Sequence, residues 1–515
     1  MPVDIDHPSL TLGIVGAGVM GRGIAQIAAQ AGIRVLLHDS RDGAAAEARQ
    51  SLDGVFGKLA EKGRISTTQH AAALARIETA PIEAFAACDV VIEAIVENLE
   101  VKRELFRHME RIVREDCLLA SNTSSLQITT IAAACTRPGR VGGFHFFNPV
   151  PLMKVVEVIE GALSEPWVAP ALTRLATRIG HAPVRAKDTP GFLVNHAGRG
   201  YGTEALRLLG EGVAEFHHID RILREQAGFR MGPFELLDLT GLDVSHPVME
   251  SIYEQFYHEP RFRPSPVIGQ RLLAGLLGRK SGRGFYRYDG GKQEIIAPAP
   301  LPNIRPTRVW VAPDDHPDEE DGLSTAHDAV ADLVKKLGGR LDEGDNPAQD
   351  SLCVVTPLGH DASNVAADLE LDPRRTVALD PLMGFTKHRV VMTTILTEPS
   401  MRDAALGLFG SDGVPASAIH DSAGFVTQRV VAHIINIACD IAQQRIASPR
   451  DIDLAVTLGL GYPQGPLAWG DALEATRVLQ VLEGLESYYG DPRYRPSPWL
   501  QRRARLGVSL LSPDA

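Results

Sequence analysis

The 515-residue chain is 44% hydrophobic, 23% charged and 6% aromatic, which is typical of a globular protein of several domains and excludes a disordered or collagen-like chain. The formal net charge is −12 and no run of Lys or Arg stands out, so we expect no nucleic-acid or membrane partner. No segment reaches the roughly 18 apolar residues of a membrane span, and the N-terminus does not resemble a signal peptide. The five scattered cysteines indicate reduced thiols, and we predict a cytoplasmic protein without a metal site.

Short apolar runs alternate with helical patterns over the first 185 residues, as a mostly parallel sheet with crossover helices requires. The predicted strands are Leu10–Val15, Arg34–His38, Val90–Ile95, Cys117–Ala120, Val141–Phe146, Lys154–Ile159 and Ala182–Arg185. The predicted helices are Val19–Ala31, about 42–62 and Leu99–Glu115.

Helical periodicity replaces the strand pattern from Asp188 to about Leu277, and a proline-rich linker follows at 295–306. A second α/β pattern and then a second helical pattern complete the chain. The elements predicted there are strands at Val309–Ala312, Leu352–Thr356, Thr376–Leu379 and Val390–Thr394, a helix at Ala326–Leu337, and helices from Asp421 onward.

The second helical segment repeats the first. Asp188-Thr-Pro-Gly-Phe192 matches Asp421-Ser-Ala-Gly-Phe425 at an offset of 233 residues, and the same offset relates Asp220 to Asp453. We therefore predict a duplicated helical domain, with each copy preceded by an α/β domain. The four predicted domains span 1–187, 188–294, 306–419 and 420–515.

A glycine-rich turn connects the first predicted strand to the first helix. In such a G-x-G-x-x-G turn, glycines permit a tight turn, a close approach of pyrophosphate and helix–strand packing, while the helix N-terminus attracts phosphate. Asp39 ends the second strand, where a carboxylate binds the adenosine ribose and repels a 2′-phosphate, so NAD is favoured over NADP, although Arg41 lies nearby. The alternative for Asp39 is a turn or helix cap. The candidate cofactor-binding residues of the turn are Gly16, Gly18, Val19, Met20 and Gly21.

His145 and Glu157 lie twelve residues apart on two predicted strands that a proline-rich turn joins. If the strands are neighbours, the carboxylate would fix the imidazole tautomer and stabilise the imidazolium, as a general acid–base requires. The alternatives are a histidine satisfied within the core and a glutamate that forms a surface ion pair.

The motifs Ser121–Ser125, His145–Pro149, Glu157 and Asp188–Asn195 together resemble the L-3-hydroxyacyl-CoA dehydrogenases over about residues 10–290. This resemblance implies a Rossmann-type NAD-binding domain followed by an all-α domain. It implies that His145 takes the proton of the substrate 3-hydroxyl as hydride leaves for the nicotinamide, and that Glu157 orients it. The further implied residues are Ser124 and Asn195 at the substrate, Glu97, Lys102 and Asn148 at the cofactor, and Lys58 and Lys62 at coenzyme A. For the two lysines, a solvated helix face is the alternative.

The second half departs from this pattern. Gln428 stands where the first copy has Asn195, and Val354–Gly359 replaces the glycine turn. A gapped alignment places Thr386 at the histidine position and Met392 at the glutamate position. We therefore expect a reduced, inactive Rossmann-like domain, as in two-copy bacterial members of the family. The twin helical domains would pack on each other within one chain as a pseudo-dimer, with a homo-oligomer as the alternative.

The leading hypothesis is NAD-dependent oxidation of an L-3-hydroxyacyl-CoA in fatty-acid or phenylacetate-type catabolism, with 3-hydroxyadipyl-CoA as a candidate substrate. Two alternatives stay open: a dehydrogenase of a free hydroxy acid on the same fold, and a non-catalytic nucleotide-binding relative.

Overall fold

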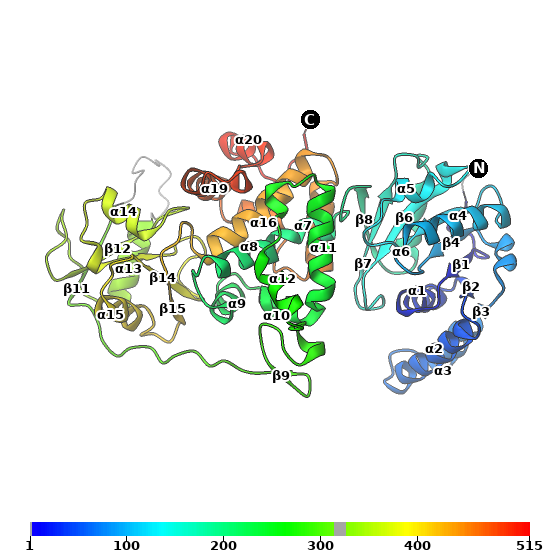
Figure 1. Cartoon of the computed structure of the whole chain (residues 1–515), viewed down its shortest axis with the longest axis horizontal. Coiled ribbons are helices and arrows are strands. Elements are labelled where there is room, and N and C mark those ends of the chain that lie inside the picture. The colour runs from blue at the N-terminus through cyan, green and yellow to red at the C-terminus, as the bar shows by residue number, and fades with distance from the viewer. Residues whose placement is uncertain (1–2, 314–325, 515) are drawn as a thin grey trace. The chain divides into compact units, whose positions relative to one another are not determined.

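The computed structural model describes residues 3–313 and 326–514, so residues 1–2, 314–325 and 515, which fall within three of the predicted domains, lie outside it. The chain forms two compact units (Figure 1). The first comprises Met1–His196 with Gln444–Leu460, and the second comprises Ala197–Gln443 with Gly461–Ala515.

The first unit is built on an eight-stranded sheet with the order β3-β2-β1-β4-β5-β6-β7-β8, parallel except between β6 and β7. Its central strands are apolar and buried throughout because helices cover both faces of the sheet. The predicted Rossmann-type arrangement is thus confirmed. The strands are β1 (Thr11–Val15), β2 (Arg34–His38), β3 (Ile77–Thr79), β4 (Val90–Glu93), β5 (Leu118–Ser121), β6 (Val141–Phe146), β7 (Val155–Glu160) and β8 (Ala182–Lys187). The helices include α1 (Val19–Gln30), α2 (Ala44–Glu61), α4 (Leu99–Ile112), α5 (Ile128–Ala132), α6 (Val168–Arg178) and α7 (Val194–Ala197).

The elements of this unit that were not predicted include helix α3 (Thr67–Ala75), edge strand β3 and the crossover helices α5 and α6. A capping box of Ser66 and Gln69 begins α3, and this Ser-x-x-Gln signal was present in the sequence. Only Ile77 of β3 is buried, so that strand has no apolar run to reveal it.

The second unit contains the first helical domain, a five-stranded sheet and most of the second helical domain. The sheet order is β11-β12-β13-β14-β15, parallel except between β13 and β14, so the expected reduced α/β domain is confirmed. The strands are β11 (Arg308–Val311), β12 (Ser351–Val355), β13 (Thr376–Leu379), β14 (Arg389–Thr393) and β15 (Ala416–Ile419), the last of which was not predicted. The helices include α8 (Arg199–Gly210), α9 (Phe216–Glu225), α10 (Pro233–Thr240), α11 (Leu242–Gln255), α12 (Pro266–Leu273), α13 (Ala326–Lys336), α14 (Ala362–Asp368), α15 (Pro399–Phe409), α16 (Val426–Gln443), α18 (Pro466–Ala472), α19 (Ala475–Tyr489) and α20 (Pro498–Leu506).

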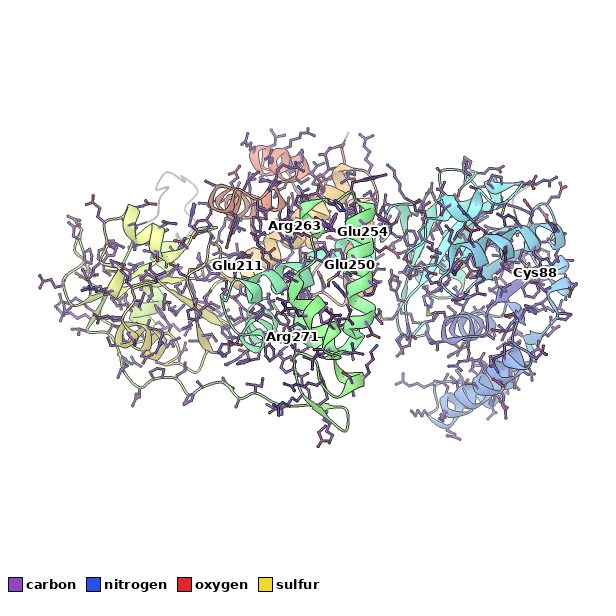
Figure 2. All side chains as sticks on the ribbon, viewed as in Figure 1. Cys88, Glu211, Glu250, Glu254, Arg263 and Arg271 are labelled. Atoms are coloured by element: carbon purple, nitrogen blue, oxygen red, sulfur yellow. The ribbon has the colours of Figure 1, made fainter. Side chains whose placement is uncertain are left out.

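Helix α8 of the first helical copy packs along α16 of the second. Buried Glu204 of α8 lies 2.8 Å from Arg429 of α16 and 2.8 Å from Arg493. Arg429 also reaches Glu211, which Figure 2 labels, at 2.5 Å. Burial alone would raise the pKa of Glu204, but the two guanidinium groups hold it well below its usual value. The twin helical copies therefore share a buried ionic interface within one chain.

One helix of the second copy belongs to the first unit. Helix α17 (Pro449–Leu460) packs on β7 and β8, and the preceding residues cover the edge of the sheet. The backbone N–H of Lys187 in β8 donates to the carbonyl of Ile446 at 2.9 Å. The outer edge of β8 is thus paired rather than open.

Candidate active site

The glycine turn between β1 and α1 has room for a dinucleotide. Gly16 has a φ of 104°, and a Cβ placed on it would lie 2.4 Å from the carbonyl oxygen of Ala94. A Cβ on Gly21 would lie 1.8 Å from the carbonyl oxygen of Gly16, so both positions require glycine. Gly18 caps α1 and faces open space, with nothing within 4 Å of an added Cβ. The first turn of α1 carries no acidic residue, and the turn therefore fits a pyrophosphate.

Asp39, at the end of β2, already holds the turn in place. One carboxylate oxygen accepts the N–H of Ala17 at 2.7 Å and the other accepts the N–H of Arg41 at 2.9 Å. The Arg41 side chain pairs with Glu47 at 2.6 Å. Asp39 thus makes hydrogen bonds within the turns on either side of it, and its role as a ribose acceptor stays a prediction.

A polar network lies at the carboxyl ends of β4 and β5. Buried Lys102 of α4 lies 2.5 Å from Glu93 and 3.3 Å from Glu97. Glu97 accepts the hydroxyl of Thr123 at 2.6 Å and the backbone N–H of Ser124 at 2.9 Å. Burial would raise the pKa of Glu97, but these hydrogen bonds and the Lys102 ammonium outweigh it and lower that pKa. The predicted residues Glu97, Lys102 and Ser124 are therefore brought together, while Glu93 was missed because its role depends on how the strands pair.

His145 and Glu157 face each other across the antiparallel strands β6 and β7. Nδ1–H of His145 donates to Oε2 of Glu157 at 2.5 Å, and both side chains are buried. The backbone N–H groups of Leu193 and Val194 donate to Oε1 of Glu157 at 2.9 and 2.8 Å. Nε2 of His145 has no hydrogen-bond partner among the described residues. The pair therefore has a fixed tautomer and a ring nitrogen available to a ligand.

The remaining predicted residues lie at the rim or beyond it. Asn148 is exposed just after β6, and Asn195 is partly buried in the short helix α7. Lys58 lies in the last turn of α2 and Lys62 is its C-cap. Both lysines are exposed, and neither has an ion-pair partner among the described residues.

Among the residues that the structure describes, the reduced sheet has no counterparts of β1, β2 and β3. Asp421 accepts the N–H of Ala362 in α14 just as Asp188 accepts the N–H of Ile128 in α5, both at 2.8 Å. This match makes β12 the counterpart of β5, so the interpretation of Val354–Gly359 as a replaced glycine turn was wrong. Instead, no segment in the described part of the reduced domain corresponds to the glycine turn.

The strand register also corrects the aligned residues. Val184 and Ser417 are equivalent at the repeat offset, and they pair with Glu157 and Val390 respectively. The N–H of Asp380 donates to the carbonyl of Val390, which places Asp380 at the position of His145. Thr386 and Met392 are therefore not the equivalents of the pair, because the connection between the two strands differs in length. The reduced domain has neither the imidazole nor the carboxylate partner.

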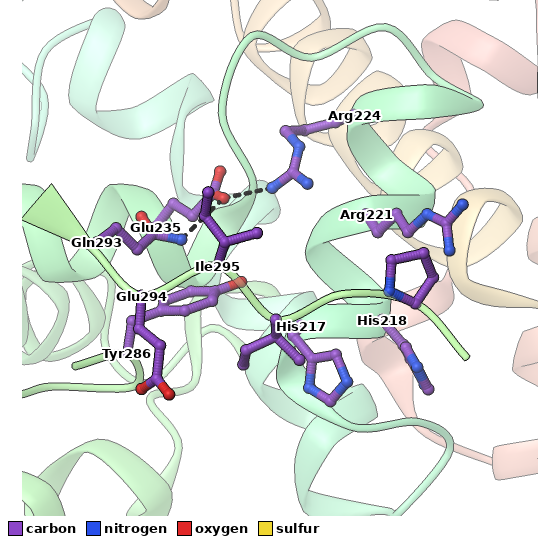
Figure 3. A pocket seen from close by; sticks show the side chains of 11 residues that line it. His217, His218, Arg221, Arg224, Glu235, Tyr286, Gln293, Glu294 and Ile295 are labelled. Atoms are coloured by element: carbon purple, nitrogen blue, oxygen red, sulfur yellow. Dashed lines mark hydrogen bonds and ion pairs between the residues drawn. The ribbon is translucent and has the colours of Figure 1, made fainter. Parts of the chain in front are cut away.

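A separate cavity of about 190 Å³ lies in the second unit, between α9, α10 and the chain after β10 (Lys292–Gln293) (Figure 3). Glu235 there binds Arg224 and, at 3.2 Å, Gln293. Burial lowers the pKa of His217 and His218. Over residues 3–313 and 326–514, no group of His, Cys, Asp and Glu is placed to hold a metal, and no helix is long and apolar enough to cross a membrane.

A Rossmann-type sheet with this glycine turn and a buried imidazole–carboxylate pair near the carboxyl ends of its strands defines a nucleotide-dependent dehydrogenase. The chain belongs to the 3-hydroxyacyl-CoA dehydrogenase family: the model of the NAD-binding domain matches residues 11–189, and that of the C-terminal domain matches 191–288 and again 424–509. It is thus an NAD-dependent oxidoreductase that acts on 3-hydroxyacyl-CoA.

Similar proteins cover either the whole chain or its first half. A 3-hydroxyadipyl-CoA dehydrogenase of Escherichia coli K12 is 37% identical over 502 residues, which are 96% of this chain and 98% of that protein. The pig mitochondrial hydroxyacyl-coenzyme A dehydrogenase is 40% identical over 53% of this chain and 90% of its own length. A crystal structure of 3-hydroxybutyryl-CoA dehydrogenase from Escherichia coli K12 has a TM-score of 0.83 at 36% identity, over 97% of this chain and 98% of that one.

Proposed function

We propose that the first half performs the reaction with His145 as the general acid–base and Glu157 as its partner. The observation that carries this proposal is the 2.5 Å contact between His145 Nδ1 and Glu157 Oε2 in a buried strand pair. A buried carboxylate that accepts two backbone N–H groups is held rigidly, and it therefore fixes the orientation of the imidazole ring.

In the oxidative direction, Nε2 of His145 takes the proton of the 3-hydroxyl while the C3 hydride is transferred. NAD, when bound, supplies the hydride acceptor. Glu157 keeps Nδ1 protonated and balances the charge that forms on the ring. Ser124 would donate to the substrate oxygen and Asn195 would hold the substrate against His145.

Lys58 and Lys62 would bind phosphate groups of coenzyme A. Both are exposed and unpaired within the described residues, on a protein whose net charge is −12. Glu97, Lys102 and Asn148 would line the cofactor beside the glycine turn. We place the protein in the cytoplasm.

A separate proposal concerns the acyl group of the substrate. The whole-length relative named for 3-hydroxyadipyl-CoA favours a dicarboxylic acyl-CoA, and hence phenylacetate-type aromatic catabolism, over long-chain fatty-acid oxidation.

The test follows NADH absorbance with acetoacetyl-CoA, 3-oxoadipyl-CoA and free acetoacetate as oxidants. We expect decay with both thioesters, a higher kcat/KM for the dicarboxylic one, and none with the free acid. Glu157→Gln should lower kcat by roughly 10²-fold or more, because the carboxylate no longer stabilises the imidazolium. Wild-type kcat in that variant would refute the paired mechanism, and decay with free acetoacetate would favour a free hydroxy acid as substrate.

A further inference from the structure

Helix α17, which comes from the second helical copy, ends against the residues that hold Glu157. A Cβ placed on Gly459 would lie 3.1 Å from both methyl carbons of Val194 and 3.4 Å from a methyl carbon of Val155 in β7. Val194 is buried, and its backbone N–H donates to Glu157 at 2.8 Å. Only one residue therefore separates the end of α17 from the carboxylate of the proposed catalytic pair.

The same two repeat positions meet in the other half of the chain. At the offset of 233 residues, Gly459 corresponds to Gln226 and Val194 corresponds to Thr427. The hydroxyl of Thr427 donates to Oε1 of Gln226 at 2.5 Å, and Nε2 of Gln226 donates to Asp380 at 3.2 Å. In the first half, α17 of the second helical copy thus contacts the α/β domain that precedes the first copy, beside Glu157. In the second half, the end of α9 of the first helical copy contacts the α/β domain that precedes the second copy, at Asp380.

The chemistry of this shared contact differs between the halves. In the reduced half, the glutamine side chain reaches Asp380, which stands at the position of His145. In the catalytic half, the glycine leaves that space empty of side chain, so that α17 supports Val194 without entering the site. Close-packed interiors transmit displacements of a few tenths of an ångström, so a bulkier residue at 459 would move Val194 and, with it, the amide that binds Glu157.

We infer that Gly459 of the second copy is a positioning residue for the reaction of the first, and that the second half completes the catalytic half through α17. The inference rests on the proposed role of Glu157. It assigns the inactive half a function in turnover, in addition to its packing against the first helical domain.

The test compares the full-length variants Gly459→Ala and Gly459→Val with acetoacetyl-CoA and NADH. We expect kcat to fall by roughly 3-fold and roughly 30-fold, since displacing a catalytic group by about 1 Å costs on the order of 10²-fold. The Kd for NADH, measured by fluorescence titration, should stay at its wild-type value, because the glycine turn lies between β1 and α1 and makes no contact with Gly459.

Two further variants separate positioning from a general loss of structure. Gly269→Ala, in helix α12 with its nearest neighbour at 3.8 Å, is the matched control and should keep wild-type kcat. Val194→Ala removes the opposing methyl groups, so adding it to Gly459→Ala should restore kcat above that of the single variant. Wild-type kcat in Gly459→Val, or no recovery in the double variant, would overturn the inference. A large effect of Glu157→Gln alongside an unaffected Gly459→Val would refute only this step, whereas wild-type kcat in Glu157→Gln would refute the proposed function itself.

Discussion

The two α/β domains of this chain share a strand arrangement, but they differ in which strands remain. Sheet β11–β15 reproduces the pattern of β4–β8, including the single antiparallel pair. Over its described residues it has no equivalent of β1–β3, the part of the first sheet that carries the glycine turn and Asp39. Loss of one end of a doubly wound sheet therefore removes the dinucleotide site as a block, while β7 and β8, which α17 contacts, have counterparts in β14 and β15.

The substitutions at the retained strands follow the same logic. His145 and Glu157 become Asp380 and Val390. Asp380 is fully buried, and Gln428 donates to it at 2.9 Å. Burial raises the pKa of Asp380, although the hydrogen bonds from Gln428 and Gln226 oppose this effect. The proposed catalytic pair thus has as its counterpart a buried hydrogen-bond network of Asp380 with two glutamine side chains.

The largest expected difference between the two α/β domains concerns His145 and Asp380, which occupy equivalent positions in their sheets. His145→Gln should lower kcat with acetoacetyl-CoA by roughly 10³-fold, because a glutamine cannot transfer the proton. Asp380→Asn should leave kcat unchanged and instead lower the free energy of unfolding by about 1–3 kcal/mol, since a buried acceptor of side-chain amides is lost. Steady-state kinetics measure kcat of both variants, and thermal unfolding measures their stability. A kcat loss in Asp380→Asn equal to that of His145→Gln would contradict the division of roles.

The second prediction concerns the interface between the helical copies. Arg429→Met should destabilise the chain by about 3–5 kcal/mol, because it leaves Glu204 buried with one cation fewer. The double variant Arg429→Met with Glu204→Gln should recover part of this loss, since the buried carboxylate that lost one of its two cations is now neutral, and only Arg493 is left without its carboxylate partner. Chemical denaturation of the wild type, the single variants Arg429→Met and Glu204→Gln, and the double variant gives the coupling energy between the two residues. Additive losses of stability would show that the ion pair does not support the interface.

Much of this organisation could be predicted from the sequence, and the failures have physical causes. The contact between His145 and Glu157 was predicted on the condition that their two strands are neighbours, which the structure confirms, whereas their catalytic role was implied by the resemblance to the dehydrogenase family. Glu93 was missed because its partner Lys102 is on a helix and only the packed sheet brings the two together. The equivalents of the pair in the reduced domain were assigned wrongly, because register depends on hydrogen bonding between strands, and a change in loop length shifts any alignment of sequence alone.

The membership of α17 could not be inferred from the repeat at all. The repeat assigns 449–460 to the second helical domain, whereas its apolar side packs on β7 and β8 of the first unit. Periodicity tells which face of a helix is buried but not which sheet buries it.

A pH dependence should accompany the ionic interface of the helical copies. Burial, together with the nearby Arg493, lowers the pKa of His433 to about 3, while Glu204 opposes this shift. The folded chain therefore excludes a proton that the unfolded chain binds below the usual histidine pKa of about 6.5, so stability is complete above that pH and is lost as the pH falls toward 3. Between pH 6 and 5, His433→Gln should reduce the slope of unfolding free energy against pH by about 1.4 kcal/mol per pH unit. An unchanged slope would show that His433 is not buried in its neutral form.

The smallest expected effect is that of replacing Lys58 and Lys62, which tests whether these two lysines bind the substrate. No helix in the described part of the reduced half corresponds to α2, so Lys58 and Lys62 have no counterpart there. Lys58→Ala and Lys62→Ala should each raise the KM for acetoacetyl-CoA by roughly 3-fold at low salt with little change in kcat, as expected for exposed charges that bind phosphate. The increase should shrink as ionic strength rises, because screening weakens such contacts. Lys336→Ala, at the end of α13 in the reduced half, is the control, since it removes an exposed helix-terminal cation far along the chain from any proposed substrate residue. An equal KM change in that variant would indicate a general effect of net charge, and the two lysines of the catalytic half would then be a solvated helix face.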